Sequence, residues 1–392
     1  MPHRALSSRP LYNPRLAGLR CISCGHTADI GDHPRGCPAC EARGQPSSFE
    51  AVYASLPRAL RPAASGFAWG DWLPFIDGVS LAEGGTPCLP LPAIARELGI
   101  ARLSAKHEGL NPTGSHKDRM SAQAVSRALE VGADSVVLAS SGNAAVSAAA
   151  YCAAAGLRCE VATYQNLPAV FATALQRLGA RRVAFEHGAQ RWEHVRRRVE
   201  DDGAFALTNY CRPAVGSPVL GVEGYRAVAL ECAADGCVPD HVLVPTARGD
   251  LLWGVYSGFR DLQAAGLVDR LPRIWAVEPF PRLARVLQGA SAQAEFAGAT
   301  GQFSIAGDTV TLQQVHATRR SGGGAVVVDD LQAHRGALRL AQAGLWVELC
   351  AGAGLAALAE LRADGRVAAH EHALLLLTAK GDRDPFDPAS LH

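Results

Sequence analysis

The sequence predicts an α/β protein of two open parallel-sheet lobes with a small zinc ribbon near its N-terminus. Its 392 residues are too many for one comfortable core and enough for two. From about Leu103 onward, short β-type runs alternate with helical patterns, which favours parallel sheets built from βαβ units. Two cysteine pairs close to the N-terminus indicate the ribbon.

The ribbon is predicted from two Cys-x-x-Cys pairs separated by twelve residues. Four thiolates at this spacing close a tetrahedral shell around Zn²⁺, so we expect a structural metal site at Cys21, Cys24, Cys37 and Cys40. The other seven cysteines stand singly in apolar contexts, and buried free thiols are expected there. They are Cys88, Cys152, Cys159, Cys211, Cys232, Cys237 and Cys350.

The remaining elements follow from hydrophobic periodicity. A stretch from about Leu56 to Asp77 has no clear period and is expected to be a connector on the surface. The expected strands and helices then alternate in two series. The first series contains a strand at Ser135–Leu138, a helix at Ala144–Ala155, a strand at Cys159–Ala162, a helix at Ala169–Leu178, a strand near Val183 and an arginine-rich helix around Gln190–Glu200. The second contains His241–Pro245 (strand), Leu251–Ala264 (helix), Ile274–Val277 (strand) and Leu374–Leu377 (strand).

Composition and charge exclude several classes of protein. With 38 basic and 37 acidic residues the formal net charge is +1, which argues against electrostatic capture of nucleic acid or acidic membrane. The aliphatic runs, such as Ala373–Leu377, are far too short to span a bilayer. The N-terminal segment lacks the apolar stretch of a secretory signal, so a cytoplasmic protein is expected. The helix that bears Arg191, Arg196, Arg197 and Arg198 is expected to present a solvated face and not a nucleic-acid patch.

Two segments carry the residues best suited to chemistry. Turn formers in Asn111–Arg119 directly precede a helical pattern, which puts Lys117 in the first turn of a helix, where the helix dipole disfavours a cation. A lysine held there is easier to keep as a neutral amine, although a solvated lysine is the plainer interpretation. The second segment, Ser140-Ser141-Gly142-Asn143, joins a strand to a helix and suits an anionic group, or is an ordinary N-cap at Ser141 or Asn143.

These segments resemble motifs of threonine synthase and its relatives in the β-family (fold type II) of pyridoxal-phosphate enzymes. NPTGSHKDR is similar to the lysine motif of that family, and SSGNAAVSAAAYCA is similar to its Ser/Thr-Gly-Asn loop and following helix. The resemblance covers roughly Leu19 to Pro385, and a cysteine ribbon also occurs in members of this family. Further matching stretches are Glu83–Pro87, Gly221–Tyr225, Val244–Pro245, Val347–Glu348, Ala353–Leu361 and Leu377–Gly381.

The resemblance implies a cofactor, pyridoxal 5'-phosphate, and roles for individual residues. Lys117 would form the Schiff base with the cofactor and move protons at the substrate carbons. Asn143 would hydrogen-bond the ring hydroxyl, and Thr378 would face the pyridine nitrogen, where a hydroxyl leaves that nitrogen largely unprotonated. The substrate carboxylate would be received by Ser140, Ser141 and Gly142.

The segment that resembles the family's glycine-rich phosphate cradle departs from the pattern. It reads Thr246–Leu251 and holds one glycine, Gly249, where several are expected. Arg248 could replace lost N–H contacts with a charged one, whereas Asp250 would repel a phosphate unless it turned away. We therefore expect the cofactor's phosphate at Ala247, Arg248, Gly249 and Asp250, with the details open.

Other positions also differ from the family. His116 stands where phenylalanine is usual, Met120 where glycine is common, and Ala379 replaces a glycine. His116 is expected either to contact the substrate or to pack in place of phenylalanine. Lys106 is expected to contact a substrate anion, and Lys380 is expected to lie near the cofactor ring. These changes suggest that the substrate differs from phosphohomoserine.

The resemblance implies a pyridoxal-phosphate-dependent lyase or transferase acting on a small amino acid by elimination and replacement of a β- or γ-substituent. The first candidate reaction converts O-phosphohomoserine and water to threonine and phosphate. The alternatives are replacement on O-phosphoserine, as in cysteate synthesis, deamination of serine or threonine, and a non-catalytic cofactor-binding relative. The tryptophan-synthase-β-like fold type II would divide the chain into a ribbon (1–50), a large lobe (51–110 and 209–392) and a small lobe (111–208). The resemblance also favours a homodimer.

Overall fold

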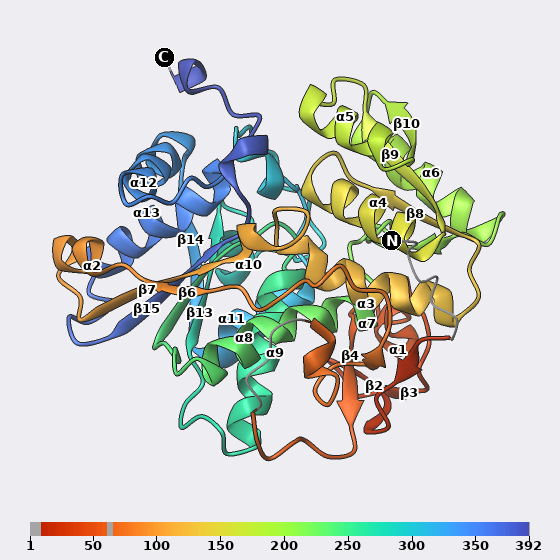
Figure 1. Cartoon of the computed structure of the whole chain (residues 1–392), viewed down its shortest axis with the longest axis horizontal. Helices are drawn as coiled ribbons and strands as arrows, with labels where there is room; N and C mark the ends of the chain where they lie inside the picture. Colours follow the sequence, from red (N-terminus) through yellow and green to blue (C-terminus); the bar gives the residue numbers. More distant parts are fainter. Residues whose placement is uncertain (1–8, 61–65, 392) are drawn as a thin grey trace.

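The structure, a computed structural model, describes residues 9–60 and 66–391 (Figure 1). Residues 1–8, where the N-terminal segment predicted to be non-secretory begins, lie outside this part, as do residues 61–65 of the predicted connector and His392. Within the described ranges, no helix combines the length and the apolar character needed to cross a membrane.

The larger of the two main sheets has six strands, and all neighbouring strands are parallel except the edge pair β6 and β7. The predicted strand His241–Pro245 is confirmed with the same bounds and lies inside this sheet. In spatial order the strands are β14 (Gly324–Val327), β13 (Arg273–Glu278), β12 (His241–Pro245), β15 (His372–Leu377), β7 (Arg102–His107) and β6 (Cys88–Pro90).

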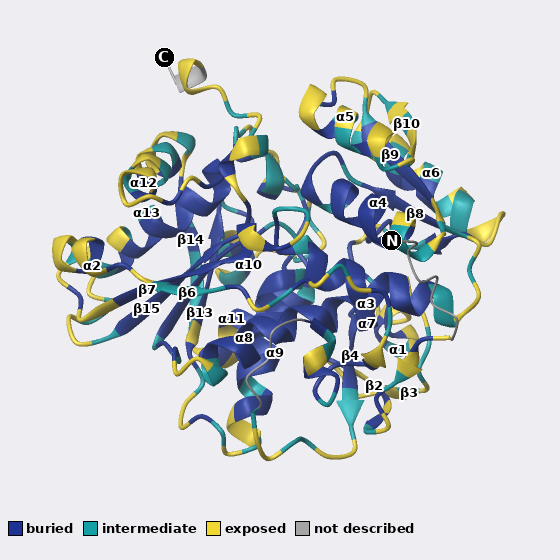
Figure 2. Cartoon of the chain, in the orientation of Figure 1, coloured by how far each residue is buried: buried dark blue, intermediate teal, exposed yellow. Residues whose placement is uncertain are grey.

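Both faces of this sheet are buried by helices, which explains why its central strands are continuous apolar runs. Along β12 the side chains alternate: Val242 and Val244 join one hydrophobic cluster, and Leu243 joins the other. Figure 2 shows these strands in dark blue in the interior of the large lobe. Helices α8 (Arg226–Ala234), α9 (Asp250–Ala264) and α11 (Leu312–Ser321) contribute to the first cluster, and α2 (Pro92–Leu98), α12 (Asp330–Gln342) and α13 (Leu349–Ala363) to the second.

The second main sheet has four parallel strands and lies in the upper right part of Figure 1. Its strand order is β10 (Arg181–Phe185), β9 (Arg158–Tyr164), β8 (Ser135–Ala139) and β11 (Phe205–Ala206). The helices that go with it are α3 (Lys117–Glu130), α4 (Asn143–Ala155), α5 (Ala169–Arg177) and α6 (Gly188–Glu200). The alanine-rich helix α4 ends at Gly156, whose φ of 70° is the left-handed conformation that terminates many helices.

The prediction of an α/β fold with two parallel-sheet lobes and an N-terminal ribbon is confirmed. The ribbon is an antiparallel sheet of β3 (Thr27–Ala28), β2 (Leu16–Cys21) and β4 (Phe49–Tyr53), with the short helix α1 (Pro38–Glu41). The domain boundaries stay a prediction, and β4 crosses the one expected at residue 50. Other short elements are η2 (Glu108–Leu110), α7 (Val219–Val222), η3 (Glu223–Tyr225), α10 (Leu283–Leu287), η4 (Phe303–Ile305), η5 (Gly381–Arg383) and η6 (Pro388–Leu391).

The predicted surface connector between Leu56 and Asp77 is wrong for its second half. Trp69, Trp72 and Leu73 are at most 3% exposed and belong to the largest hydrophobic cluster. The segment contains η1 (Gly66–Trp69) and β5 (Phe75–Asp77), and β5 pairs with β1 (Leu11–Tyr12). The sequence of this segment shows no hydrophobic period because the segment does not bury one face of a long helix or strand. It packs single aromatic side chains between the ribbon and the large lobe.

The expectation of seven free buried thiols is also wrong in part. Cys88, next to β7 on strand β6, is joined to Cys237, which follows α8, by a disulfide. Sequence could not reveal this pair, because 149 positions separate the two residues and only the fold brings them together. Cys211 is a free thiol but only half-buried. The remaining four expected thiols are free and buried: Cys152, Cys159, Cys232 and Cys350.

Candidate active site

A cavity of about 330 Å³ lies where the two main sheets meet. Three of its walls are loops that directly follow parallel strands: Ser140–Asn143 after β8, Thr246–Gly249 after β12, and Thr378 after β15. Open parallel sheets bind ligands at the carboxyl ends of their strands, and the volume falls at the low end of small-molecule sites, which span about 300–1,000 Å³. The structure therefore brings most of the predicted site residues to one cleft.

Lys117 opens helix α3 and lines this cleft. Its Nζ lies 5.9 Å from the centre of the Tyr225 ring, and within the described ranges it forms no ion pair. Burial lowers the pKa of the amine, and the positive charge of Arg248 lowers it further, whereas Asp250 and Glu348 oppose this change only in part. A lysine with a lowered pKa supplies the neutral amine that a nucleophile or a proton acceptor needs.

The loop before α4 presents hydrogen-bond donors to the cleft. The Oγ of Ser141 accepts hydrogen bonds from the backbone N–H of Tyr164 and from Nη1 of Arg191, both at 3.1 Å. A hydroxyl that accepts twice still has its own proton to donate. The Ser141 hydroxyl and the free N–H groups at the N-terminus of α4 can therefore bind a carboxylate. Ser140 and Gly142 line the same wall of the cavity.

The loop after β12 is held in a conformation that suits an anion. Its first three carbonyl groups each accept a hydrogen bond from a side chain outside the loop: Arg282 donates to Thr246, Gln314 to Ala247 and Thr311 to Arg248. In a trans peptide the N–H points opposite to the carbonyl. The N–H groups of residues 247–249 therefore point away from these side chains, and the three residues line the cleft.

One glycine suffices in this loop because its carbonyls are fixed by side chains. Gly249 has a φ of 87°, and a Cβ at this position would collide with Gln314, so only glycine fits. Asp250 also lines the cavity, but its carboxylate is oriented toward Ser217, whose backbone N–H and hydroxyl donate to it at 3.2 and 2.7 Å. The expected repulsion of a phosphate by Asp250 is reduced by this orientation.

Thr378 and His116 form another wall of the cavity. The Thr378 side chain is 2% exposed, and its hydroxyl donates to Oε1 of Glu348 at 2.7 Å. His116 Nδ1 lies 3.1 Å from the carbonyl oxygen of Thr378, and because a carbonyl only accepts, Nδ1 carries the proton. Burial and the nearby charge of Lys117 hold the pKa of His116 well below its usual range, so the ring is neutral.

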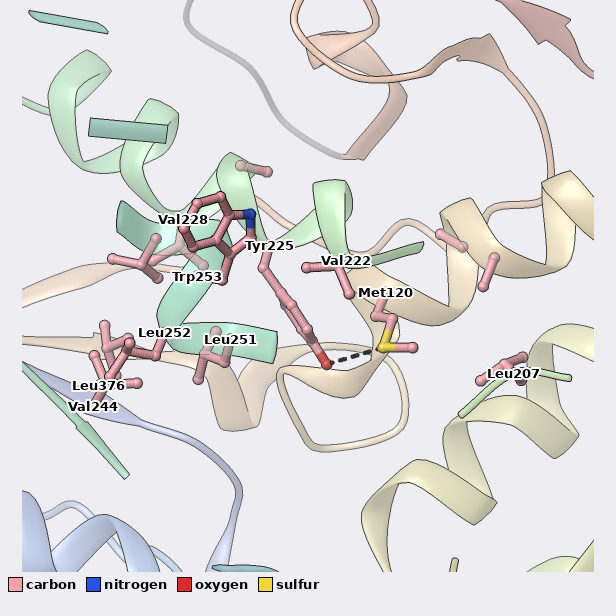
Figure 3. Close-up of a cluster of buried hydrophobic side chains, with 14 of the residues drawn as sticks. Met120, Leu207, Val222, Tyr225, Val228, Val244, Leu251, Leu252, Trp253 and Leu376 are labelled. Carbon is pink, nitrogen blue, oxygen red and sulfur yellow. Dashed lines mark hydrogen bonds between the residues drawn. The ribbon is translucent and has the colours of Figure 1, made fainter. Parts of the chain in front are cut away.

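Met120, one of the departures from the family pattern, packs next to this wall. Its Sδ lies 3.6 Å from the hydroxyl of Tyr225, a contact drawn as the dashed line in Figure 3. Tyr225 is fully buried, and its ring is also 5.6 Å from that of His116. His116 is thus tethered by the backbone of Thr378 and packed on Tyr225 while one edge still reaches the cavity.

Sequence reasoning assigned no role to Glu348, although it lies at the centre of the site. It is 5% exposed and lines the cavity with Lys117. Its carboxylate accepts hydrogen bonds from Thr378, from Nδ2 of Asn143 at 3.1 Å and from the hydroxyl of Ser304 at 2.9 Å. Burial raises the pKa of Glu348, and the hydrogen bonds offset part of this rise. The match of Val347–Glu348 to the family was the only signal for it.

The expected solvated face of the arginine-rich helix α6 needs a correction. The Arg196 side chain is 43% exposed and forms ion pairs with Glu193 and Glu200, as expected. Arg191, however, lines the cavity, where its guanidinium lies 3.7 Å from the centre of the Tyr164 ring and hydrogen-bonds Ser141. Helical spacing alone did not reveal that this first turn of α6 faces the cleft.

The two other lysines do not line the cavity. Lys106 is fully buried and forms an ion pair of 2.7 Å with Glu231, which in turn binds Arg119. Contact of Lys106 with a substrate anion does not fit this position, because its charge is already neutralised by Glu231. Lys380 is exposed, so its expected position beside a ring is not supported either.

The four cysteines of the ribbon form a cluster, with all four sulfur atoms within 4.8 Å of one another. The Sγ atoms of Cys21 and Cys40 lie 3.6 Å apart, and those of Cys24 and Cys37 lie 3.7 Å apart. A tetrahedron with Zn–S bonds of about 2.3 Å has edges of about 3.8 Å. The geometry and the ligand type therefore fit a tetrahedral metal ion.

Comparison with known proteins identifies the family. Residues 79–379, which contain the whole cleft, match the family described as "Pyridoxal-phosphate dependent enzyme". The chain belongs to this family. It is 28% identical over 384 residues to a threonine synthase of Methanocaldococcus jannaschii, covering 93% of each chain, and 33% identical over 322 residues to one of Synechocystis sp., covering 78% of this chain and 79% of the relative.

Solved structures agree on the fold. A pyridoxal 5'-phosphate-dependent aspartate racemase superimposes with a TM-score of 0.66 at 20% identity, covering 77% of this chain and 93% of the racemase. With the threonine synthases as relatives, the protein is a pyridoxal-phosphate-dependent lyase.

The residues that line the cleft are suited to bind the cofactor of this family. Lys117 provides a buried amine of lowered pKa. The N–H groups of residues 247–249 have no backbone partner among the described residues and can bind a phosphate. Asn143 uses Nδ2 as a donor to Glu348 and Ser304, which leaves its Oδ1 free to accept from a hydroxyl. These residues are the ones that the family resemblance had implied.

Proposed function

We propose that this enzyme removes the phosphate of a small O-phosphorylated amino acid and then adds a nucleophile, with O-phosphohomoserine and water giving threonine and phosphate as the first candidate reaction. The observation that carries this proposal is a pair of arginines in the cleft, Arg191 and Arg248, neither of which forms an ion pair with a carboxylate of the described residues. The threonine synthases among its relatives support the same substrate class.

The two arginines are held by aromatic rings and not by ion pairs. Arg191 lies over Tyr164, and Arg248 lies 5.4 Å from the centre of the Trp192 ring. Neither guanidinium has an ion-pair partner among the residues that the structure describes, and Nε of Arg191 is buried without a hydrogen-bond partner. Burial lowers the pKa of Arg191, and the charge of Arg248 adds to this effect. A bound dianion would pair with both guanidinium groups, which would offset the burial of Arg191 and the repulsion between the two positive charges.

The proposed reaction divides the work among the residues of the cleft. Ser141 and the N-terminus of α4 bind the substrate carboxylate and fix the orientation of its Cα. Lys117 takes the proton from Cα and returns a proton to the side-chain carbon, as its lowered pKa allows. Arg191 and Arg248 bind the phosphate as it leaves. Pyridoxal phosphate supplies, when bound, the electron sink for the carbanion.

Replacement on O-phosphoserine is the second candidate, because His116 and Met120 change the wall of the cleft while both arginines remain. Deamination of serine or threonine leaves the arginines without a partner, and a non-catalytic role leaves the lowered pKa of Lys117 unused. The homodimer, the cytoplasmic location and the lack of nucleic acid or membrane partners stay predictions.

A substrate panel tests the proposed function. We expect the enzyme loaded with cofactor to release phosphate from O-phosphohomoserine or O-phosphoserine at least about tenfold faster than it deaminates serine or threonine. Arg191→Ala should raise KM for the phosphorylated substrate about 10- to 100-fold, since a hydrogen bond to a charged group contributes about 1.5–3 kcal/mol. Phosphate is measured by colorimetry and the amino-acid product by chromatography.

The control for this panel lies on the same helix. Arg197 is exposed on the solvent side of α6, and Arg197→Ala should leave KM unchanged. Phosphate release from O-phosphohomoserine without threonine would overturn the threonine reaction alone. Turnover of serine with no phosphate release from either ester would overturn the phosphate proposal as a whole.

We further propose that the cysteine cluster binds structural Zn²⁺. Purified protein should contain about one zinc per chain, and Cys37→Ser should lose it and lower the Tm by about 5 °C or more, because structural zinc contributes to folding. Metal content is measured by atomic absorption and Tm by calorimetry. Cys211→Ser, at a half-buried thiol outside the cluster, should keep the metal. Retention of zinc by Cys37→Ser would contradict the assignment.

A further inference from the structure

The ribbon is connected to the cofactor site by helix α11. The first cysteine pair encloses Ile22 and Ser23, and both residues contact this helix. The carbonyl of Ile22 accepts a hydrogen bond from Nη2 of Arg320 at 2.7 Å, and the hydroxyl of Ser23 lies 2.8 Å from Nε2 of His316. The turn that carries two of the four cysteines is therefore attached directly to α11.

The second cysteine pair is linked to the same contact through Ser47. The backbone N–H of Cys37 donates to the carbonyl of Ser47 at 2.8 Å, and the hydroxyl of Ser47 lies 2.7 Å from that of Ser23. Ser47 is 1% exposed, so this link lies inside the ribbon. Ligation of a metal by all four cysteines would fix both ends of the link, and with them the position of the Ser23 hydroxyl on His316.

The same helix holds the loop that we assign to the phosphate of the cofactor. Gln314 donates to the carbonyl of Ala247, and Thr311, which directly precedes α11, donates to the carbonyl of Arg248 at 2.7 Å. His316 follows Gln314 by two positions, and at 3.6 residues per turn the two side chains leave the helix about 200° apart. Helix α11 therefore lies between the ribbon and the phosphate loop and contacts each with a different side.

A second path leads from the ribbon to the start of helix α9. Gly36, which stands between the two cysteine pairs, has a φ of 73°, and a Cβ there would lie 2.7 Å from Cγ1 of Val215. The backbone of the ribbon thus packs closely on this side chain. Two positions later, Ser217 donates to the carboxylate of Asp250, the first residue of α9. The ribbon therefore supports the phosphate loop from α9 as well as from α11.

This support is needed because the loop lacks the glycines of the family pattern. Its single glycine is Gly249, and two of its carbonyls are held by Gln314 and Thr311. A peptide plane turns as one unit. If α11 released these two carbonyls, the N–H groups of residues 248 and 249 would turn with them and lose their orientation toward a phosphate.

We propose that the ribbon positions the phosphate loop through α11, so that metal binding at the four cysteines and cofactor binding in the cleft strengthen each other. Ser23, His316 and Arg320 are the positioning residues, and all three lie outside the cavity. The inference rests on zinc as the metal of the cysteine cluster and is independent of the substrate. Coupling between two sites is reciprocal: the factor by which zinc raises the affinity for pyridoxal phosphate is also the factor by which pyridoxal phosphate raises the affinity for zinc.

The experiment measures cofactor binding to the full chain with and without zinc. The dissociation constant of pyridoxal phosphate is obtained from its visible absorbance, first for the zinc-loaded protein and then after removal of the metal by a chelator under reducing conditions. We expect removal of zinc to raise this constant about fivefold or more, as is typical of coupled sites. In the converse titration, against a chromophoric chelator, bound cofactor should raise the affinity for zinc by the same factor. Circular dichroism checks that the metal-free protein stays folded.

A double variant separates positioning from loss of the ribbon. Ser23→Ala with Arg320→Met removes the contacts to α11 and keeps all four cysteines, so zinc should remain bound. Its dissociation constant for pyridoxal phosphate should be raised about fivefold or more, and removal of zinc should then have a smaller effect than in the wild-type protein. Ser23→Thr keeps the hydroxyl and should bind the cofactor normally. Arg319→Met, at an exposed position next to Arg320 on α11, is the matched control and should also bind normally.

The ³¹P resonance of the bound cofactor reports on the phosphate loop itself. It should shift in the metal-free protein and in the double variant, whereas the visible band, which depends on Lys117, should keep its wavelength. Equal dissociation constants with and without zinc, a zinc effect of full size in the double variant, or an unchanged ³¹P resonance would each overturn the inference. A protein that binds no zinc would overturn it together with the zinc assignment. Because no substrate is present, failure of the phosphate-ester proposal would not affect these results.

Discussion

Lys117→Ala is expected to abolish turnover and to remove the visible absorbance that bound pyridoxal phosphate gives the wild-type protein. Loss of a positioned proton-transfer group alone costs about 10²- to 10⁴-fold in rate, and this variant also loses the amine that holds the cofactor. No other lysine can substitute, since Lys106 is buried in an ion pair with Glu231 and Lys380 is exposed outside the cavity. The measurements are kcat and an absorbance spectrum after removal of free cofactor.

Lys380→Ala is the matched control for Lys117→Ala. It removes the same ammonium group from an exposed position, so both the spectrum and kcat should stay at the wild-type values. If Lys117→Ala kept the visible band and Lys380→Ala lost it, the amine would be assigned to the wrong residue. Folding of each variant is checked by circular dichroism, because α3 begins at Lys117.

The parts of the site that could be predicted are those written in contiguous sequence. Lys117 and Asn143 each stand at a strand–turn–helix junction, where local turn formers and the following apolar period place the side chain. The loop after β12 was located in the same way, because His241–Pro245 is an apolar run that ends in a proline and is followed by a helix. Local signals of this kind act over a few residues and do not depend on the tertiary structure.

The contacts that complete the site could not be predicted, because each joins distant parts of the chain. The carbonyls of the loop 246–248 are held by Arg282, Thr311 and Gln314, and no local pattern connects these residues to the loop. The sequence therefore shows only that glycines are missing from the loop, whereas the fold shows that side chains from other segments hold its backbone. Glu348 was overlooked for the same reason, since its three hydrogen-bond partners lie on three separate segments.

Arg119 is expected to be essential for stability, although it lies only two residues from Lys117. Its guanidinium binds Glu108 at 2.6 Å and Glu231 at 2.6 Å, and all three side chains are at most 3% exposed. Arg119→Met would leave Glu108 without its cation and Glu231 with Lys106 alone. Removing one partner of a buried ion pair costs about 3–5 kcal/mol, because the remaining charge stays in a medium that solvates it poorly. Urea denaturation should report a loss of this size.

The pH dependence of that loss distinguishes unpaired charge from lost packing. Burial alone would raise the pKa of Glu108, but the charge and hydrogen bonds of Arg119 hold it at about 2. A folded pKa below the unfolded value of about 4.3 means that the wild-type protein gains stability from Glu108 above that pH and loses it as the pH falls toward 2. Without Arg119 the pKa of the buried carboxyl rises, so the variant is penalised at neutral pH and relieved as Glu108 takes up a proton.

The difference in unfolding free energy between Arg119→Met and the wild-type protein should therefore narrow between pH 7 and pH 4. A difference that stays constant over this range would mean that lost packing, and not unpaired charge, accounts for the effect. Arg196→Met is the control, because Arg196 also binds two carboxylates, Glu193 and Glu200, but on the solvated face of α6. It should change stability little at either pH, since solvent screens exposed ion pairs. Two arginines with the same number of partners are thus expected to differ because only one of them is buried.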